Sequence, residues 1–373
     1  MFMEGVSESF PLEKGALLCI DLKALQDNYL FMKNLSSPRI ASVVLKANAY
    51  GLGLCPIAKA LFKVGVKDYF VTTLEEGIAL RKTLGEDIHI YILNGVLKGT
   101  EDILNVHNLI PVLLSLEQLS LWRAYAQKIQ KKCLAILQVN AGMGRFGLSF
   151  EEAKTVAEDP NGLEGVELLY ILGHLSSASL STHPRNEIER DCFEDFLALF
   201  PNVPATFSNS PGILLGKRYH FDMTRMGIAL YGGAPLEDQP NSLKPVLSLK
   251  ARILQVRSLK CGMTVGYDGT YVMPEDGRVA TVNIGFGDGF PRALSNKGYG
   301  LIQGIKVPIA GRISMDWMSF DVTHIPEKDV APGDLVTLLG GDLTIDSVAA
   351  CAGTTSYDLI SGLGARLHRT YGG

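Results

Sequence analysis

A lysine follows the first strongly apolar segment of the chain and could act as a nucleophile. Lys46 comes directly after IASVVL (40–45) and precedes ANAYGLG. An amine at the end of a buried strand loses hydration, which lowers its pKa and frees its lone pair for attack on a carbonyl. A lysine at such a position is more often a surface charge, so Lys46 alone does not indicate catalysis. The other residues near it in the sequence and in the fold must support that role.

Two arginines stand in settings that suit a bound anion. Arg145 lies in QVNAGMGRFG beside three glycines, which let a backbone approach a ligand closely. A glycine loop carrying a solvated arginine explains that motif equally well. Arg225 lies inside the apolar segment FDMTRMGIALYG. Because an unpaired buried arginine costs several kcal/mol, Arg225 needs a partner and is the more distinctive of the two.

The remaining polar candidates are individually weak. His174 in GHLSS is a lone histidine, and such residues are more often structural than catalytic. Asn209 and Ser210 in SNSPG could donate hydrogen bonds to an anion. The seven histidines show no metal-ligand spacing, so we expect no metal site. The glycine-rich segment 284–290 lacks the G-x-G-x-x-G spacing of a dinucleotide loop.

The apolar segments that carry these residues alternate with amphipathic helical patterns over the first part of the chain. We expect strands at 40–45, 69–72, 88–93, 109–114, 134–139, 166–171, 204–208 and 225–232. Eight such units predict an α/β fold with an N-terminal (β/α)8 TIM-type barrel, and a doubly wound sheet is the rival. In a barrel the active site lies at the carboxyl ends of the strands, where these polar residues would converge.

The texture of the sequence changes after residue 240. Segments that alternate with period two are separated by turns rich in glycine and proline, which predicts a mostly antiparallel β domain. We therefore place a barrel at 14–240 and a C-terminal β domain at 241–373, with 237–245 as the linker and residues 1–13 available to pack on the second domain.

Composition narrows the function class. The net charge of -4 argues against a nucleic-acid-binding surface. No apolar run is long enough to span a bilayer, and the acidic N-terminus does not resemble a signal peptide. The six cysteines are scattered, without a CxxC pair, which favours a reducing compartment. We expect a cytoplasmic protein with a small-molecule substrate and neither nucleic acid nor membrane as a partner.

The ordered motifs together carry a specific resemblance. VVLKANAYGLG is similar to the cofactor-lysine signature of alanine racemases, and NAGMGRFG, FSNSPG, FDMTRMGIALYG, VGYDGTY, IGFGDGFPRAL and GRISMDWM are similar to later blocks of that family, in the same order. The resemblance runs from about Lys14 to the C-terminus. It implies a pyridoxal 5'-phosphate enzyme that interconverts L- and D-alanine and supplies D-alanine for peptidoglycan in the cell wall.

The resemblance also assigns roles to residues of this chain. Lys46 would hold the cofactor covalently, and Arg225 would face the pyridine nitrogen and keep it unprotonated. Arg145 would contact the phenolic oxygen of the cofactor and the substrate carboxylate. His174 would lie beside the cofactor. The phosphate would be held by Tyr50, Ser210, Gly227, Ile228 and Tyr357.

Racemisation needs a base on each face of the substrate Cα, and the resemblance supplies two. Lys46 would serve one face, and Tyr267 would serve the other from the second subunit of a homodimer. Hydrogen bonds from His174 and Arg225 would make the Tyr267 hydroxyl a useful base. Met315 of the second subunit would bind the substrate carboxylate through its backbone amide.

Four positions depart from the family pattern. Gln138 stands where a carbamylated lysine often steadies Arg145, and we hypothesise that its amide oxygen or a bound anion replaces the carbamate. Leu52 and Thr206 each stand where a histidine is usual, and Phe286 replaces a tyrosine at the mouth of the site. None of the four removes a base or the cofactor lysine.

Three other functions remain open at this stage. A racemase for another amino acid, such as serine or lysine, would use the same residues. A pyridoxal-phosphate decarboxylase commonly has an acidic residue at the ring nitrogen, and Arg225 argues against it. A non-catalytic carrier of the cofactor would lack the second domain that this chain has.

Overall fold

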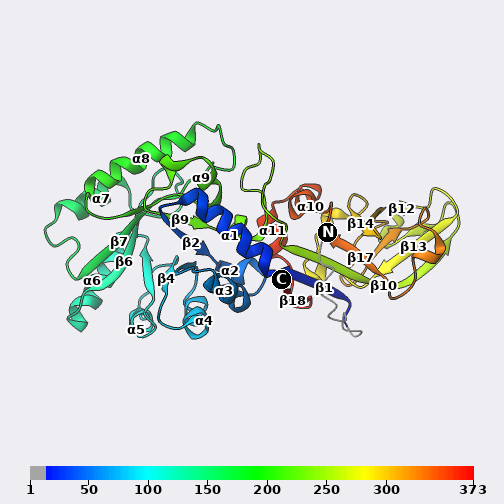
Figure 1. Cartoon of the computed structure of the whole chain (residues 1–373), viewed down its shortest axis with the longest axis horizontal. Helices are drawn as coiled ribbons and strands as arrows, with labels where there is room; N and C mark the ends of the chain where they lie inside the picture. Colours follow the sequence, from blue (N-terminus) through cyan, green and yellow to red (C-terminus); the bar gives the residue numbers. More distant parts are fainter. Residues whose placement is uncertain (1–13) are drawn as a thin grey trace.

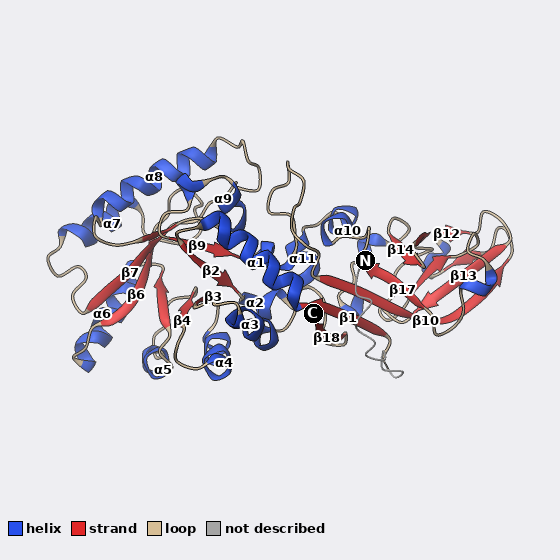
Figure 2. Ribbon diagram, in the orientation of Figure 1, coloured by secondary structure: helices blue, strands red, loops and turns tan. Residues whose placement is uncertain are grey.

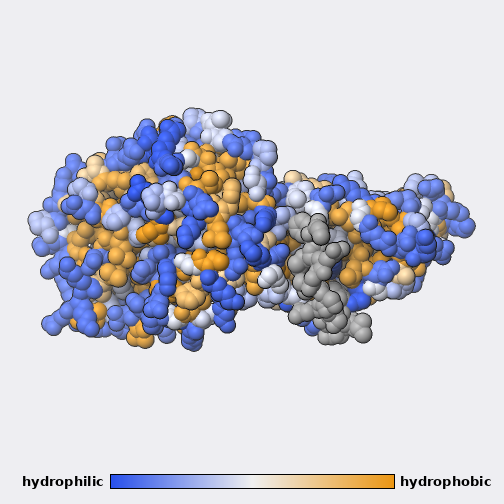
Figure 3. Space-filling view, viewed as in Figure 1, coloured by the Kyte–Doolittle hydropathy of each residue, from blue (hydrophilic) through white to orange (hydrophobic). Residues whose placement is uncertain are grey.

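The structure is a computed structural model that describes residues 14–373. The expected packing of residues 1–13 therefore lies outside the described residues. The molecule is elongated, with a barrel at one end and a β domain at the other, joined through a narrower waist (Figures 1 and 3). Within residues 14–373, no helix has the length and apolar character needed to cross a membrane.

The first part of the chain forms a closed barrel of eight strands, and neighbouring strands run parallel. This confirms the predicted (β/α)8 barrel and rules out the alternative, a doubly wound sheet. The strands are β2 (Ile40–Val44), β3 (Asp68–Val71), β4 (His89–Ile92), β5 (Ile110–Leu113), β6 (Cys133–Gln138), β7 (Val166–Leu172), β8 (Ala205–Thr206) and β9 (Met223–Met226). The barrel interior is filled by a cluster that includes Phe70, Tyr91 and Met223.

Helices surround the barrel (Figure 2). They are α1 (Leu22–Ser36), α2 (Lys46–Tyr50), α3 (Leu54–Lys63), α4 (Leu74–Leu84), α5 (Glu101–Val106), α6 (Leu116–Ile129), α7 (Phe150–Glu158), α8 (Arg185–Leu199) and α9 (Ser210–Leu214). Capping residues set where several of them begin. A capping box joins Thr73 to Glu76 at α4, and another joins Ser149 to Glu152 at α7.

The second part of the chain forms the predicted, mostly antiparallel sheet. Its strands are β10 (Leu247–Leu259), β13 (Gly277–Val282), β14 (Tyr299–Ile302), β15 (Ile305–Pro308), β16 (Met318–Asp321), β17 (Leu335–Leu339) and β18 (His368–Gly372), and β11 (Thr264–Val265) pairs with β12 (Tyr271–Val272). Two helices, α10 (Ile345–Ala352) and α11 (Ser356–Ser361), return toward the barrel (Figure 1). Single 3-10 turns are η1 (Lys217–Tyr219), η2 (Ile228–Tyr231), η3 (Tyr267–Gly269), η4 (Phe286–Asp288), η5 (Arg292–Leu294) and η6 (Glu327–Asp329).

Two details differ from the sequence-based expectation. The strand expected at 225–232 lies instead at 223–226, since β9 ends at Met226 and the 3-10 turn η2 follows after Gly227. Residues 16–21 form β1 (Ala16–Asp21), which lies between β10 and β18 in the second sheet. The division of the chain near residue 240 stays a proposal, in which β1 belongs to the sheet of the second domain.

Candidate active site

A pocket opens among the carboxyl ends of the barrel strands and has a volume of about 160 Å³. It brings together eleven of the residues singled out from the sequence. Ten of them lie on or follow five barrel strands, β2, β6, β7, β8 and β9, and Tyr357 lies on α11. The lining is Val44, Lys46, Tyr50, Phe70, Leu93, Gln138, Arg145, Leu172, His174, Asn209, Ser210, Arg225, Gly227, Ile228 and Tyr357. All the barrel residues that the resemblance points to therefore face one cavity.

Lys46 begins a turn of unusual handedness directly after β2. From Ala47 to Tyr50 the backbone has φ values between 53° and 56°, which non-glycine residues rarely adopt. A hydrogen bond from α4 helps to hold it, because the carboxylate of Glu76 accepts from the N–H of Asn48 at 2.9 Å. The turn carries Lys46 and Tyr50, and both line the pocket.

The second domain also fastens this turn. Arg369 on β18 donates from Nε and Nη2 to the carbonyl of Gly51, at 3.1 and 2.9 Å. The hydroxyl of Tyr371 donates to the carbonyl of Leu52 at 2.8 Å. Neither residue was predicted, because contacts across more than 300 positions leave no local pattern in the sequence. Leu52 itself is fully buried, so an apolar side chain suits its place.

Burial lowers the pKa of the Lys46 amine, and the positive charge of Arg145 lowers it further, while Glu76 acts in the opposite direction. Each effect follows from the neighbourhood of the amine, because a charged ammonium loses hydration in the pocket and is repelled by the guanidinium. The shift favours a neutral amine, which is the form that can attack a carbonyl or accept a proton.

Arg225 is buried and surrounded by neutral acceptors. Its Nη1 donates to Thr206 Oγ1 at 2.6 Å, and its Nη2 donates to the carbonyls of Gly173 at 2.8 Å and Phe207 at 3.1 Å. Burial without a carboxylate partner lowers the pKa of Arg225 to about 9. Thr206, which stands where a histidine is usual in the family, thus accepts a hydrogen bond from Arg225. Among residues 14–373 no side chain or carbonyl accepts from Nε, which leaves this donor for a group in the pocket.

His174 is the next member of the same cluster. Its Nδ1 lies 3.3 Å from Nη2 of Arg225. Desolvation, followed by the charges of Arg225, Arg145 and Lys46, lowers the pKa of His174 to about 3. The imidazole is therefore neutral at physiological pH.

The pocket also offers neutral hydrogen-bonding groups that suit a phosphate. Ser210 Oγ accepts from the N–H of Gly227 at 2.8 Å, and Tyr50 and Tyr357 line the same pocket. A Cβ at Gly227 would lie 2.4 Å from the Tyr50 hydroxyl, so only glycine lets that hydroxyl approach the backbone. Burial raises the pKa of Tyr357 to about 12 and also raises that of Tyr50, so both remain donors. Together with Lys46 and Arg225 in the same pocket, this donor set fits pyridoxal 5'-phosphate.

Two expectations about the pocket need correction. Asn209 lines the cavity, but its side chain caps α9 by accepting from the N–H of Gly212 and donates to the carbonyl of Leu175. It is therefore a structural residue rather than a free donor. Within residues 14–373, no hydrogen bond joins Gln138 to Arg145, and no carboxylate pairs with Arg145. The amide oxygen of Gln138 therefore does not act as the partner of Arg145. The other alternative, a bound anion beside Arg145, stays a hypothesis.

Two expected site residues lie outside the pocket. Tyr267 on η3 and Met315 belong to the β domain, and their side chains are 69% and 57% exposed. Tyr267 borders a separate surface hollow with Arg312 and Trp317. Phe286 is also partly exposed in this domain. A single copy of the chain therefore carries Lys46 in a pocket but leaves Tyr267 on its surface.

Among the described residues, no group of three or more histidine, cysteine or acidic side chains could hold a metal ion. The six cysteines, all within the described part of the chain, are free thiols.

Comparisons with known proteins agree with this geometry. The family model "Alanine racemase, N-terminal domain" matches residues 20–235, and "Alanine racemase, C-terminal domain" matches residues 246–371. A catabolic alanine racemase of Agrobacterium fabrum is 40% identical over 95% of this chain and 91% of its own length. An alanine racemase of Rhizobium meliloti is 40% identical over 97% of this chain and 98% of its own.

Solved structures give the same result. The alanine racemase of Bartonella henselae, crystallised with covalently bound pyridoxal phosphate, has a TM-score of 0.92 at 37% identity, and the match covers 96% of this chain and 99% of that one. The biosynthetic alanine racemase of Pseudomonas aeruginosa has a TM-score of 0.88 at 30% identity, over 96% of this chain and 100% of that one.

Proposed function

The chain belongs to the alanine racemase family, and from that membership we propose how its own residues interconvert L- and D-alanine. It is an isomerase that depends on pyridoxal 5'-phosphate. When bound, the cofactor holds the amino acid through its amine and withdraws electrons, which makes the hydrogen on Cα acidic. The remaining work is done by side chains that bind, orient and move protons.

Lys46 is proposed as the cofactor anchor and as one of the two bases. The lowered pKa of its amine makes it able to accept a proton from Cα on its own face of the substrate. In the reverse direction the same ammonium returns a proton to that face. One proton leaves and one arrives in each turnover, so the substrate keeps its atoms and changes only its configuration.

Tyr267 is proposed as the base on the opposite face, contributed by a second copy of the chain. The observation that carries this proposal is the exposure of Tyr267 outside the pocket that contains Lys46. In a homodimer the η3 turn of one copy would meet the barrel mouth of the other. The partly exposed Met315 would arrive with it and offer its backbone N–H to the substrate carboxylate.

Arg145 and Arg225 are proposed to set the charge around the substrate. Arg145 lines the pocket, and its guanidinium, which has no carboxylate partner among the described residues, can bind the carboxylate of alanine. The Nε of Arg225 would donate to the ring nitrogen of the cofactor and prevent its protonation, which weakens the withdrawal of electrons and discourages side reactions. Tyr357 narrows the cavity, which suits a methyl side chain.

Mixing two inactive variants tests the shared site. Lys46→Ala and Tyr267→Phe are each expected to be nearly inactive. After the two proteins exchange subunits, half of the dimers are hybrids with one competent site, so activity should recover to about a quarter of the parent value. If Lys46 and Tyr267 act within one copy, the mixture stays as inactive as its components.

We further propose that the enzyme works in the cytoplasm and supplies D-alanine for peptidoglycan. The free cysteines suit a reducing compartment. The chain should restore growth, without added D-alanine, to a bacterium that lacks its own alanine racemases. Lys46→Ala should fail to do so, and growth with that variant would contradict the proposal. Assays with serine and lysine would distinguish an alanine racemase from a racemase whose preferred substrate is one of these amino acids.

A further inference from the structure

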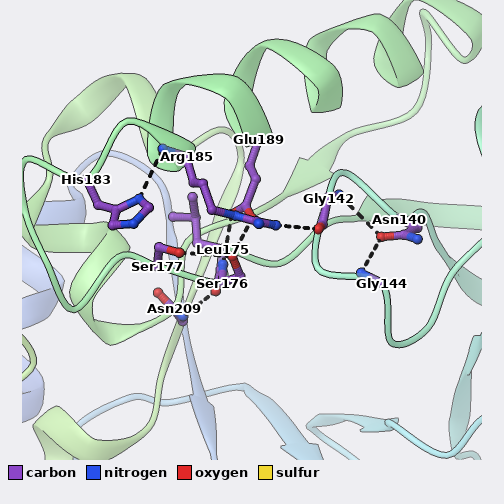
Figure 4. A network of polar contacts seen from close by, with 10 residues as sticks. All are labelled: Asn140, Gly142, Gly144, Leu175, Ser176, Ser177, His183, Arg185, Glu189 and Asn209. Atoms are coloured by element: carbon purple, nitrogen blue, oxygen red, sulfur yellow. Dashed lines mark hydrogen bonds and ion pairs between the residues drawn. The ribbon is translucent and has the colours of Figure 1, made fainter.

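Glu189 on α8 is a carboxylate that is almost completely buried near the mouth of the barrel, at 1% exposure. Its Oε2 accepts from the N–H of Ser176 at 2.8 Å, and its Oε1 accepts from the hydroxyl of the same residue. Ser176 lies two positions after His174, in the loop that follows β7. The carboxylate therefore fixes the backbone that carries His174 (Figure 4).

Arg185, one turn earlier on α8, extends this contact to a second loop. Its Nε donates to Oε1 of Glu189 at 3.3 Å, while its Nη2 donates to the carbonyl of Gly142 at 2.7 Å. Gly142 lies in the loop after β6, three positions before Arg145. A Cβ at Gly142 would lie 2.9 Å from Cγ of Glu189, so this loop rests directly on the carboxylate side chain.

The loop that carries Arg145 is folded around a second polar group. The Oδ1 of Asn140 accepts from the N–H groups of Gly142 at 3.2 Å and Gly144 at 2.9 Å. Figure 4 shows Asn140, Gly142, Arg185 and Glu189 in one continuous chain of contacts. The backbone of the loop is thus anchored on both sides. Among residues 14–373, the Arg145 guanidinium lies over the Phe146 ring, 5.6 Å from its centroid, and forms no ion pair.

We propose that Arg185, through its contacts with Glu189 and Gly142, is a positioning residue that holds the Arg145 loop against the His174 loop. In this chain, anchoring of the loop backbone holds Arg145 in position, a role that a charged partner of its side chain would otherwise have. The forked guanidinium suits this role, because it can donate to a carboxylate and a carbonyl at the same time. The proposal rests on the assignment of Arg145 to the substrate carboxylate.

Three variants of the cofactor-loaded enzyme test the proposal. Arg185→Ala removes both contacts, and Arg185→Lys keeps a positive charge beside Glu189 but cannot reach both acceptors. Arg190→Ala is the matched control, because Arg190 lies on the same helix and pairs with Asp191 and Glu194, away from both loops. The measurements are kcat, KM for L-alanine, and hydrogen exchange of the amides in 141–147 and 173–177.

Arg185→Ala is expected to raise KM about tenfold, more than it lowers kcat, because Arg145 is displaced from the substrate carboxylate. Exchange in 141–147 should accelerate at least about tenfold, since lost anchoring raises the open population. Arg185→Lys should keep the protection of 173–177 but lose that of 141–147. Arg190→Ala should match the parent in every measurement.

Two results would overturn the proposal. In the first, Arg185→Ala and Arg190→Ala give the same KM and the same exchange in 141–147. In the second, exchange accelerates equally throughout the barrel, which indicates general destabilisation. The exchange data do not depend on turnover, so faster exchange without a change in KM would fault the role of Arg145 and leave the loop contact intact.

Discussion

Nη2 of Arg225 lies 3.3 Å from Nδ1 of His174, and this contact fixes the tautomer of the histidine. A guanidinium can only donate, so Nδ1 must accept. Because the low pKa of His174 keeps the imidazole neutral, its single proton resides on Nε2. His174 Nε2 is therefore a hydrogen-bond donor. In the proposed dimer, it would donate to the hydroxyl of Tyr267.

Loss of the Tyr267 hydroxyl should affect chemistry without affecting cofactor binding. Tyr267→Phe is expected to keep the visible absorbance of the bound cofactor while the rate from L-alanine falls by about 10²–10⁴, the usual contribution of a positioned base. Racemisation followed by polarimetry measures the rate. Tyr299→Phe, at another partly exposed tyrosine of the β domain, is the control. Equal rates for Tyr267→Phe and the parent would refute the role of Tyr267.

Removal of the Thr206 hydroxyl should destabilise the protein and disturb the cofactor. This hydroxyl accepts from Arg225 Nη1 and donates to the carbonyl of Met223. Thr206→Val leaves a buried charged donor unmatched, and a loss of about 2 kcal/mol in unfolding free energy is expected. The absorbance of the bound cofactor should shift as Arg225 moves. Thr206→Ser keeps the hydroxyl and should behave as the parent does in both measurements.

The neutral His174 should make stability fall in acid. The folded protein binds a proton at His174 only below about pH 3, whereas the unfolded chain binds one below about pH 6.5. Between these values the unfolded state holds the extra proton, so the unfolding free energy decreases as pH falls, by up to about 1.4 kcal/mol per pH unit. Urea unfolding at pH 7, 5 and 4 should show a flatter profile for His174→Gln. Parallel profiles would contradict this account.

A small anion should compensate for the missing carbamate beside Arg145. We predict that replacing chloride by gluconate at constant ionic strength raises KM for L-alanine about threefold, in the range expected for an exposed ion pair. Gln138→Leu removes the amide donors that face the same pocket and should abolish the response to chloride. A parent enzyme with identical KM in both salts would eliminate the anion hypothesis.

The sequence was informative where local patterns were strong. Eight apolar segments predicted the barrel, and ordered motifs pointed to the residues that line one pocket, from Lys46 through Arg225. Capping was less visible, since SNSPG shows Asn209 beside Ser210 but does not say which side chain the helix α9 uses. Gly227 stands inside the apolar segment 225–232, and the sequence did not show that β9 ends just before it, at Met226.

Contacts between distant segments could not be predicted from the sequence. β1 precedes the barrel in the chain but pairs with β18, because its partners are chosen by the assembled sheet and not by its neighbours in sequence. Glu189 and Arg185 look like ordinary charges on an amphipathic helix, and only the packing of α8 against two loops buries one of them. The exposure of Tyr267 likewise depends on the assembled surface.

The hold of β18 on the Lys46 turn has a consequence for biosynthesis. Arg369 and Tyr371 are translated 318 to 319 residues after the carbonyls of Gly51 and Leu52 that accept from them. Domains generally fold in the order of synthesis, so a nascent barrel would exist while this turn still lacked its clamp. In the proposed mechanism, cofactor capture by Lys46 would thus follow synthesis of the second domain.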